Sequence, residues 1–125
     1  MTLVRNAAIV VAIAALSASA AYAHHSGAMY DSTKLMKMTG TVKAFNWNNP
    51  HISIDVVANP GEAVDGLWSI AGSSPGVMGR SGWNSATLKP GDKIVMEFNP
   101  LRDGGRGGNI KKVITPDGKE LGWGF

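Results

Sequence analysis

The sequence predicts an all-β domain: a small five-stranded OB-like barrel with one short helix, preceded by an N-terminal signal peptide and a short arm. Three observations predict this class. Apolar and polar residues alternate in several short segments, turn-forming Pro, Gly and Asn separate these segments, and a helix start signal falls between the third and fourth. A small β-sandwich built from the same strands is the alternative, because barrel closure leaves no mark in a sequence.

The first 23 residues have the organisation of a secretory signal. Arg5 is their only charged residue, an uncharged apolar run follows at 7–16, and small residues end in Ala21-Tyr22-Ala23. The apolar run is too short to cross a bilayer, which requires about 20 residues. We therefore expect cleavage after Ala23 and a periplasmic or secreted bacterial protein with no membrane span. Cleavage after the triplet 18–20, or an uncleaved N-terminal anchor, are the alternatives.

The composition of the mature chain limits its function. Removing residues 1–23 from the 125-residue chain leaves 102, enough for one small domain, and losing Arg5 lowers the net charge from +3 to +2. So slight an excess gives no indication of nucleic acid, which an exported protein rarely meets, and we expect no such partner. The chain has no cysteine, so a metal site would need His, Met, carboxylate or amide ligands.

The first half of the mature chain predicts an arm and three strands. Residues 24–38 show no clean period and are expected to form the arm, which leaves 39–125 for the barrel. The first strand is expected to begin at Thr39. The second, at 51–57, alternates apolar and polar residues after the turn signal Asn-Asn-Pro, and the third covers 67–71.

The second half predicts a helix and two further strands. Ser74 is a candidate N-cap with Pro75 at the first helical position, so a short helix is expected within 73–82. A Pro-Gly-Asp turn leads into a strand at 93–98. A glycine-rich loop then separates it from a fifth strand at 109–115, which a Pro-Asp-Gly turn connects to a short return.

Short motifs spread along the mature chain carry a family resemblance. They are His24-His25-Ser26, Gly40-Thr41-Val42, Asn49-Pro50-His51, Gly82-Trp83, Leu88-Lys89-Pro90-Gly91-Asp92 and Pro100-Leu101-Arg102-Asp103-Gly104. In this combination the chain resembles a family of small exported bacterial proteins classified as a domain of unknown function. The resemblance implies an exported, compact β domain and no particular activity.

The histidines suggest a metal site. If cleavage exposes His24, its free amine and imidazole can chelate one ion, and an imidazole from His25 or His51 would complete a three-nitrogen histidine brace. Such nitrogen-rich sites favour Cu(II), and an α-amine with a pKa near 8 loses its proton to a metal easily. In the alternative, His24 and His25 titrate in a frayed arm and His51 caps its turn.

Methionines supply a second type of ligand. Met36 and Met38 would lie on the same side of an extended segment, thioethers suit Cu(I), and Trp47 could offer its ring to a cation. The mixture resembles, in class only, periplasmic copper-handling proteins that use one His, two Met and a Trp on a small OB barrel. In the alternative, either methionine packs the core as an adaptable apolar group.

The leading interpretation is therefore an exported copper-binding domain that is not an enzyme, since no catalytic motif is visible. The alternative is a metal-free accessory module that docks another periplasmic protein or a small ligand. Its candidate contacts are Trp47, Trp83, Arg102 and Arg106, because Trp rings and Arg-bearing loops suit such surfaces. Buried packing for Trp83 and a solubilising role for the arginines are the simpler readings of these residues.

Overall fold

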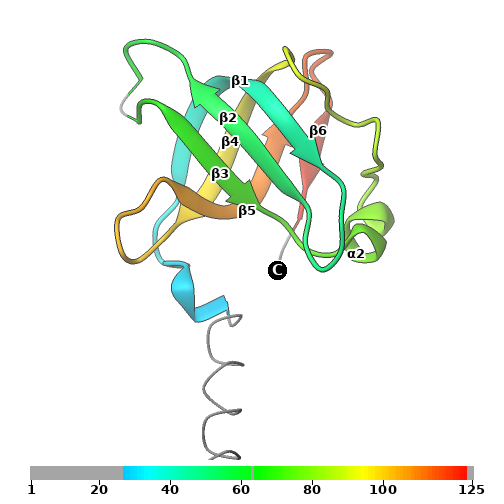
Figure 1. Cartoon of the computed structure of the whole chain (residues 1–125), viewed down its shortest axis with the longest axis horizontal. Coiled ribbons are helices and arrows are strands. Elements are labelled where there is room, and N and C mark those ends of the chain that lie inside the picture. The colour runs from blue at the N-terminus through cyan, green and yellow to red at the C-terminus, as the bar shows by residue number, and fades with distance from the viewer. Residues whose placement is uncertain (1–26, 63, 124–125) are drawn as a thin grey trace, which may run out of the picture.

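A computed structural model describes residues 27–62 and 64–123 of the chain. Strands dominate it, and a single short α-helix lies between the third and fourth strands (Figure 1). The described elements are η2 (Gly27–Met29), β1 (Met36–Asn46), β2 (Ser53–Ala58), β3 (Leu67–Ala71), α2 (Pro75–Arg80), β4 (Lys93–Pro100), β5 (Gly107–Ile114) and β6 (Glu120–Gly122). Within these residues, no helix is long and apolar enough to cross a membrane.

Strand pairing closes the sheet into a barrel. The strands follow the order β3-β2-β1-β4-β5-β6, and β3 also pairs with β5, so that β1 to β5 form a closed ring. The closing contact is parallel and joins 69–71 to 107–109, whereas the other pairings are antiparallel. Five closed strands with a helix between β3 and β4 confirm the OB-like barrel and not the sandwich.

The long strand β1 connects the two halves of the barrel. Its first part, from Met36 to Thr41, pairs with β4, and its second part pairs with β2 across a register shift between Val42 and Ala44. Gly40 pairs with both neighbours, and a Cβ there would lie 2.6 Å from the carbonyl oxygen of Val57. The bend of β1 therefore requires a residue without a side chain at this crossing.

The core of the barrel consists of inward-facing side chains, which occupy about every second position along the strands. Its fully buried members come from every strand of the ring and from α2, whose Met78 is entirely enclosed. The largest are Phe98, Met38, Ile52, Ile54, Ile70, Met78, Ile94, Met96 and Ile110. Burial of this apolar surface provides the main stabilisation of a domain that has no disulfide.

Most elements lie where the sequence predicts them. The third strand has the expected bounds, and the Ser74 side chain accepts a hydrogen bond from the Val77 amide at 3.3 Å, as an N-cap should. The first strand differs, because it begins at Met36 and not at Thr39. Residues 36–38 therefore belong to the barrel and not to the arm, since they pair with β4 at Phe98, Glu97 and Met96.

Candidate functional site

A cavity of about 630 Å³ lies on the outside of the barrel, where the N-terminal segment crosses it. Its floor is a row of register partners on four strands: Ser53 opposite Ala71, Ala71 opposite Asn109, and Asn109 opposite Asn99. Register partners share one face of a sheet. This face is the outer one, because residues that directly precede or follow these four are buried in the core: Ile52, Ile54, Ile70, Phe98 and Ile110. We call these four residues the floor.

The N-terminal segment, here residues 27–35, forms one wall of the cavity and is fastened to the loop between β4 and β5. Arg102 donates from Nε to the carbonyl oxygen of Ala28 at 2.9 Å and from its backbone N–H to the carbonyl oxygen of Met29 at 2.9 Å. The Asp31 amide donates to Pro100 at 2.8 Å. The segment therefore has a defined course beside this loop, and Figure 1 shows it rising from below the barrel into β1.

One floor residue also holds this segment. Asn99 is almost fully buried, and its Nδ2 donates to the carbonyl oxygen of Lys34 at 2.7 Å. A buried amide of this kind stabilises its surroundings only when it is hydrogen-bonded. The pair thus fixes the far end of the N-terminal segment against β4.

His51 lies at the rim of the cavity, at the entry to β2. Ile52 donates to Ser73 and accepts from Gly72, each at 2.9 Å, so the backbone next to His51 is held against the end of β3. The histidine itself is solvent-exposed, and Met29, which is 46% exposed, lines the same cavity. An imidazole and a thioether from distant parts of the chain therefore face one space.

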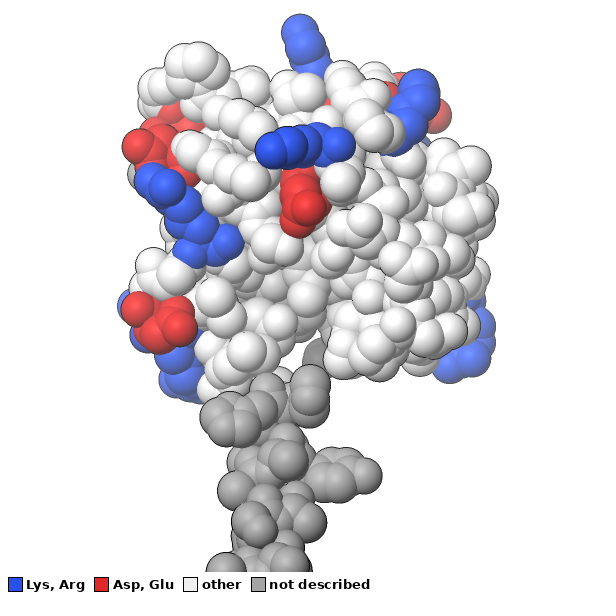
Figure 2. All heavy atoms as spheres, viewed as in Figure 1, with Lys and Arg blue, Asp and Glu red and all other residues white. Residues whose placement is uncertain are grey.

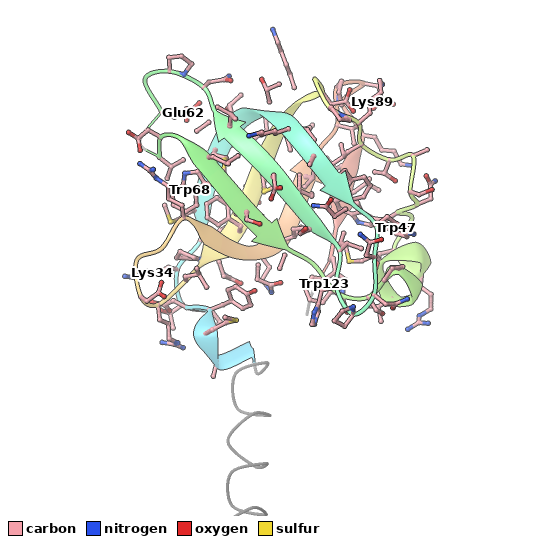
Figure 3. All side chains as sticks on the ribbon, in the orientation of Figure 1. Lys34, Trp47, Glu62, Trp68, Lys89 and Trp123 are labelled. Carbon is pink, nitrogen blue, oxygen red and sulfur yellow. The ribbon has the colours of Figure 1, made fainter. Side chains whose placement is uncertain are left out.

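Aromatic rings complete the walls. Tyr30 lines the cavity, and its burial raises the pKa of its hydroxyl above the usual tyrosine value. Trp123 also lines the cavity, and its backbone amide donates to the carbonyl oxygen of Lys111 at 3.1 Å. Figure 3 shows Trp123 at the lower end of the barrel, below the ends of β2 and β3.

The electrostatic character of the cavity is neutral to positive. Lys111 and His51 line it, and none of the described lining residues is Asp or Glu. Asp31 follows Tyr30 in the chain but does not line the cavity. Its carboxylate accepts a hydrogen bond from the Thr33 hydroxyl at 2.6 Å, which lowers the pKa of the carboxyl group. Figure 2 shows charged side chains along the upper and left margins of the viewed face, and those of the left margin reach its lower end.

The predicted metal ligands that the structure describes do not lie together. His24 and His25 lie outside the described residues, and His51 lines the cavity. Met38 is 0% exposed inside the barrel opposite Met96, so it packs the core, as the alternative interpretation held. Met36 is partly buried against the same core and does not line the cavity. Within the described part of the chain, no group of three or more His, Asp or Glu residues converges on one point.

The residues predicted to contact a ligand or partner are mostly engaged within the molecule. Trp83 is 2% exposed, and its indole N–H donates to Gly122 at 3.3 Å. Arg106 pairs with Asp65 at 2.9 Å across the barrel surface, and Arg102 holds the N-terminal segment. Trp47 packs edge-on against Phe45 with ring centroids 5.8 Å apart, and it is only partly buried.

Sequence reasoning missed the central features of this cavity. The anchoring role of Arg102 and the presence of Met29, Lys111 and Asn109 in one space depend on contacts between remote segments. The only available signal was the position of Arg102 in a loop that OB-folds commonly use for binding.

Comparisons with known proteins place the chain in a family but assign no activity. A solved structure of a mitochondrial single-stranded DNA binding protein from S. cerevisiae, Rim1, is similar with a TM-score of 0.48 and 10% identity. The match covers 66% of this chain and 92% of that one. None of the curated proteins with which the chain was compared matches it. A family profile matches residues 11–111, most of the chain, and the protein therefore belongs to the family of unknown function DUF6152.

Proposed function

We propose that this is an exported copper-binding protein whose metal site forms at the rim of the cavity. The ligands would be the amine and imidazole of a mature N-terminal His24, the imidazole of His51 and the thioether of Met29. The observation that carries the proposal is that the N-terminal segment, fastened by Arg102, lines the same cavity as His51.

Chain length supports this arrangement. Gly27 lines the cavity, and His24 precedes it by three residues. An extended chain covers at most about 3.6 Å per residue, so the α-carbon of His24 can be no more than roughly 11 Å from that of Gly27. A mature N-terminus at His24 is therefore within reach of the cavity rim.

The type of donor supports copper over hard cations. Calcium and magnesium require several oxygen ligands, chiefly carboxylates, and the part of the cavity wall that the structure describes has no Asp or Glu. Amine and imidazole nitrogens suit Cu(II), and a thioether suits Cu(I). Met29 replaces the predicted pair of Met36 and Met38 in this scheme, because Met38 is enclosed in the core and Met29 is exposed at the cavity.

Titration of the processed protein with copper tests the proposal. The secreted material is first analysed by mass spectrometry, and protein that begins at His24 is then titrated with Cu(II) and Cu(I) by isothermal calorimetry. We expect one equivalent to bind, with the electron paramagnetic resonance spectrum of the Cu(II) form showing nitrogen ligands. H51A and H24A should each weaken Cu(II) binding at least about tenfold, which corresponds to about 1.4 kcal/mol.

Two further variants of this protein serve as controls. A version with one extra N-terminal residue keeps every side chain but displaces the chelating amine, so it should bind Cu(II) as weakly as H24A. M36A removes a thioether that does not line the cavity and should bind as the parent protein does. The proposal fails if the mature chain begins elsewhere, or if the parent, H24A and H51A bind copper equally.

A further inference from the structure

A second feature of the same cavity points to a different ligand. We infer that the floor and the adjoining wall bind a small organic carboxylate with a planar body, whether or not a metal is present. The inference rests on a cavity whose described lining holds a lysine, hydrogen-bond donors and aromatic rings but no Asp or Glu. It goes beyond copper binding, because it uses Lys111, Asn109 and Trp123, which play no part in the proposed metal site.

The two consecutive lysines of β5 have different surroundings. Lys112 lies 3.5 Å from a carboxylate oxygen of Glu97 and 4.0 Å from one of Glu120, so two acids neutralise it. Lys111 lines the cavity and has no ion pair within the described part of the chain. A carboxylate in the cavity would therefore meet an ammonium group that pairs with none of the Asp and Glu residues at 27–62 and 64–123.

The floor adds hydrogen-bonding groups beside this charge. Asn109 lies opposite Asn99, and the donor group of Asn99 is already engaged with Lys34. Asn109 has a free amide among the described contacts, and the hydroxyls of Ser53 and Ser73 line the same space. These groups can donate to carboxylate oxygens, whereas a cationic ligand would find no Asp or Glu among the cavity residues that the structure describes.

The size and walls of the cavity favour an organic molecule over an inorganic anion. Ligand sites for small molecules commonly have volumes of about 300–1,000 Å³, and this cavity has about 630 Å³. Trp123 and Tyr30 line it with aromatic surface, and Met29 adds an apolar side chain. Aromatic side chains bind flat apolar bodies by stacking and by area burial, so the carboxylate should carry such a body.

The test compares a charged probe with its neutral isostere. Metal-free protein, prepared with a chelating resin, is titrated with benzoate and separately with benzamide while ¹⁵N NMR spectra are recorded. We expect saturable shifts for the amides of Asn109 and Lys111 and for the indole N–H of Trp123. Benzoate should bind with a Kd on the order of 1 mM and benzamide at least about tenfold more weakly.

Two lysine variants provide the matched control. K111M should lower the affinity for benzoate at least about tenfold, and K112M should change it by less than about twofold, because Lys112 is paired with acids. If K111M does not fold, the comparison of benzoate with benzamide on the parent protein decides alone. Equal binding of the two probes, equal effects of the two variants, or no saturable shift at the cavity would each overturn the inference. Because no metal is present, these results are independent of the copper titrations.

Discussion

The anchoring of the N-terminal segment by Arg102 can be tested with a single substitution. R102M keeps most of the aliphatic stem of the side chain but removes the Nε–H that donates to Ala28. Hydrogen bonds from charged groups contribute about 1.5–3 kcal/mol. This one is solvent-exposed, so we expect about 1 kcal/mol. Two backbone hydrogen bonds to the segment remain, from Arg102 to Met29 and from Asp31 to Pro100.

Amide hydrogen exchange measures the expected effect directly. A loss of about 1 kcal/mol multiplies the population of the locally open state by roughly five. The backbone amides of residues 31 and 102 should therefore exchange about fivefold faster in R102M, because both bond across the joint between the segment and the loop. The midpoint of global urea unfolding should change little, because the contact lies at the edge of the barrel.

R106M is the matched control, since Arg106 pairs with Asp65 on another part of the surface. It should leave the exchange of the amides of residues 31 and 102 unchanged. If R102M left both amides at parent rates, or if R106M accelerated them equally, Arg102 would not hold the segment. The support that this anchor gives to the proposed copper site would then be lost.

Three further predictions concern the core and the cavity. M38A should lower the free energy of unfolding by about 2–5 kcal/mol in urea titrations, because the side chain is fully enclosed; a loss under 1 kcal/mol would contradict its place in the core. G108A should destabilise by about 1–3 kcal/mol or more, since the new Cβ would lie 2.5 Å from the Phe98 ring. A Cβ at Gly79 in α2 would meet nothing within 4 Å, so G79A should stabilise the protein by up to about 1 kcal/mol. Equal unfolding midpoints for G108A and G79A would refute this packing. Burial raises the pKa of Tyr30, the one tyrosine left after the expected cleavage, so ultraviolet titration should give a value above about 10. The unfolded chain then loses the phenolic proton first, and stability should fall as pH rises through that range; a titration midpoint at or below about 10 would show that the hydroxyl is not buried.

Local patterns in the sequence predicted most of the fold. The third strand, the Ser74 cap and the barrel class were predictable because alternation, capping and turn chemistry each depend on residues a few positions apart. The start of the first strand was wrong by three residues. The segment 36–38 carries no alternation strong enough to show that it would pair with β4, which lies about sixty residues further along the chain.

The candidate site depended on contacts that no local pattern encodes. Arg102 and Ala28 are 74 positions apart, and Asn99 and Lys34 are 65 apart, yet these two contacts position the N-terminal segment beside His51. The different surroundings of Met29 and Met38 were equally inaccessible to sequence patterns. Both are flexible apolar residues near the arm, and only the pairing of β1 with β4 places one in the core and leaves the other exposed.

The amino-acid sequence by itself thus determined most of the strands, the helix cap and the lack of disulfides, because these follow from nearest neighbours and composition. Closure of the ring, through the parallel pairing of β3 with β5, was decided only in three dimensions. That closure brings the ends of β2, β3 and β5 beneath the N-terminal segment. A cavity lined by an imidazole, a lysine and aromatic rings forms there because those strands meet, although their residues are scattered along the chain.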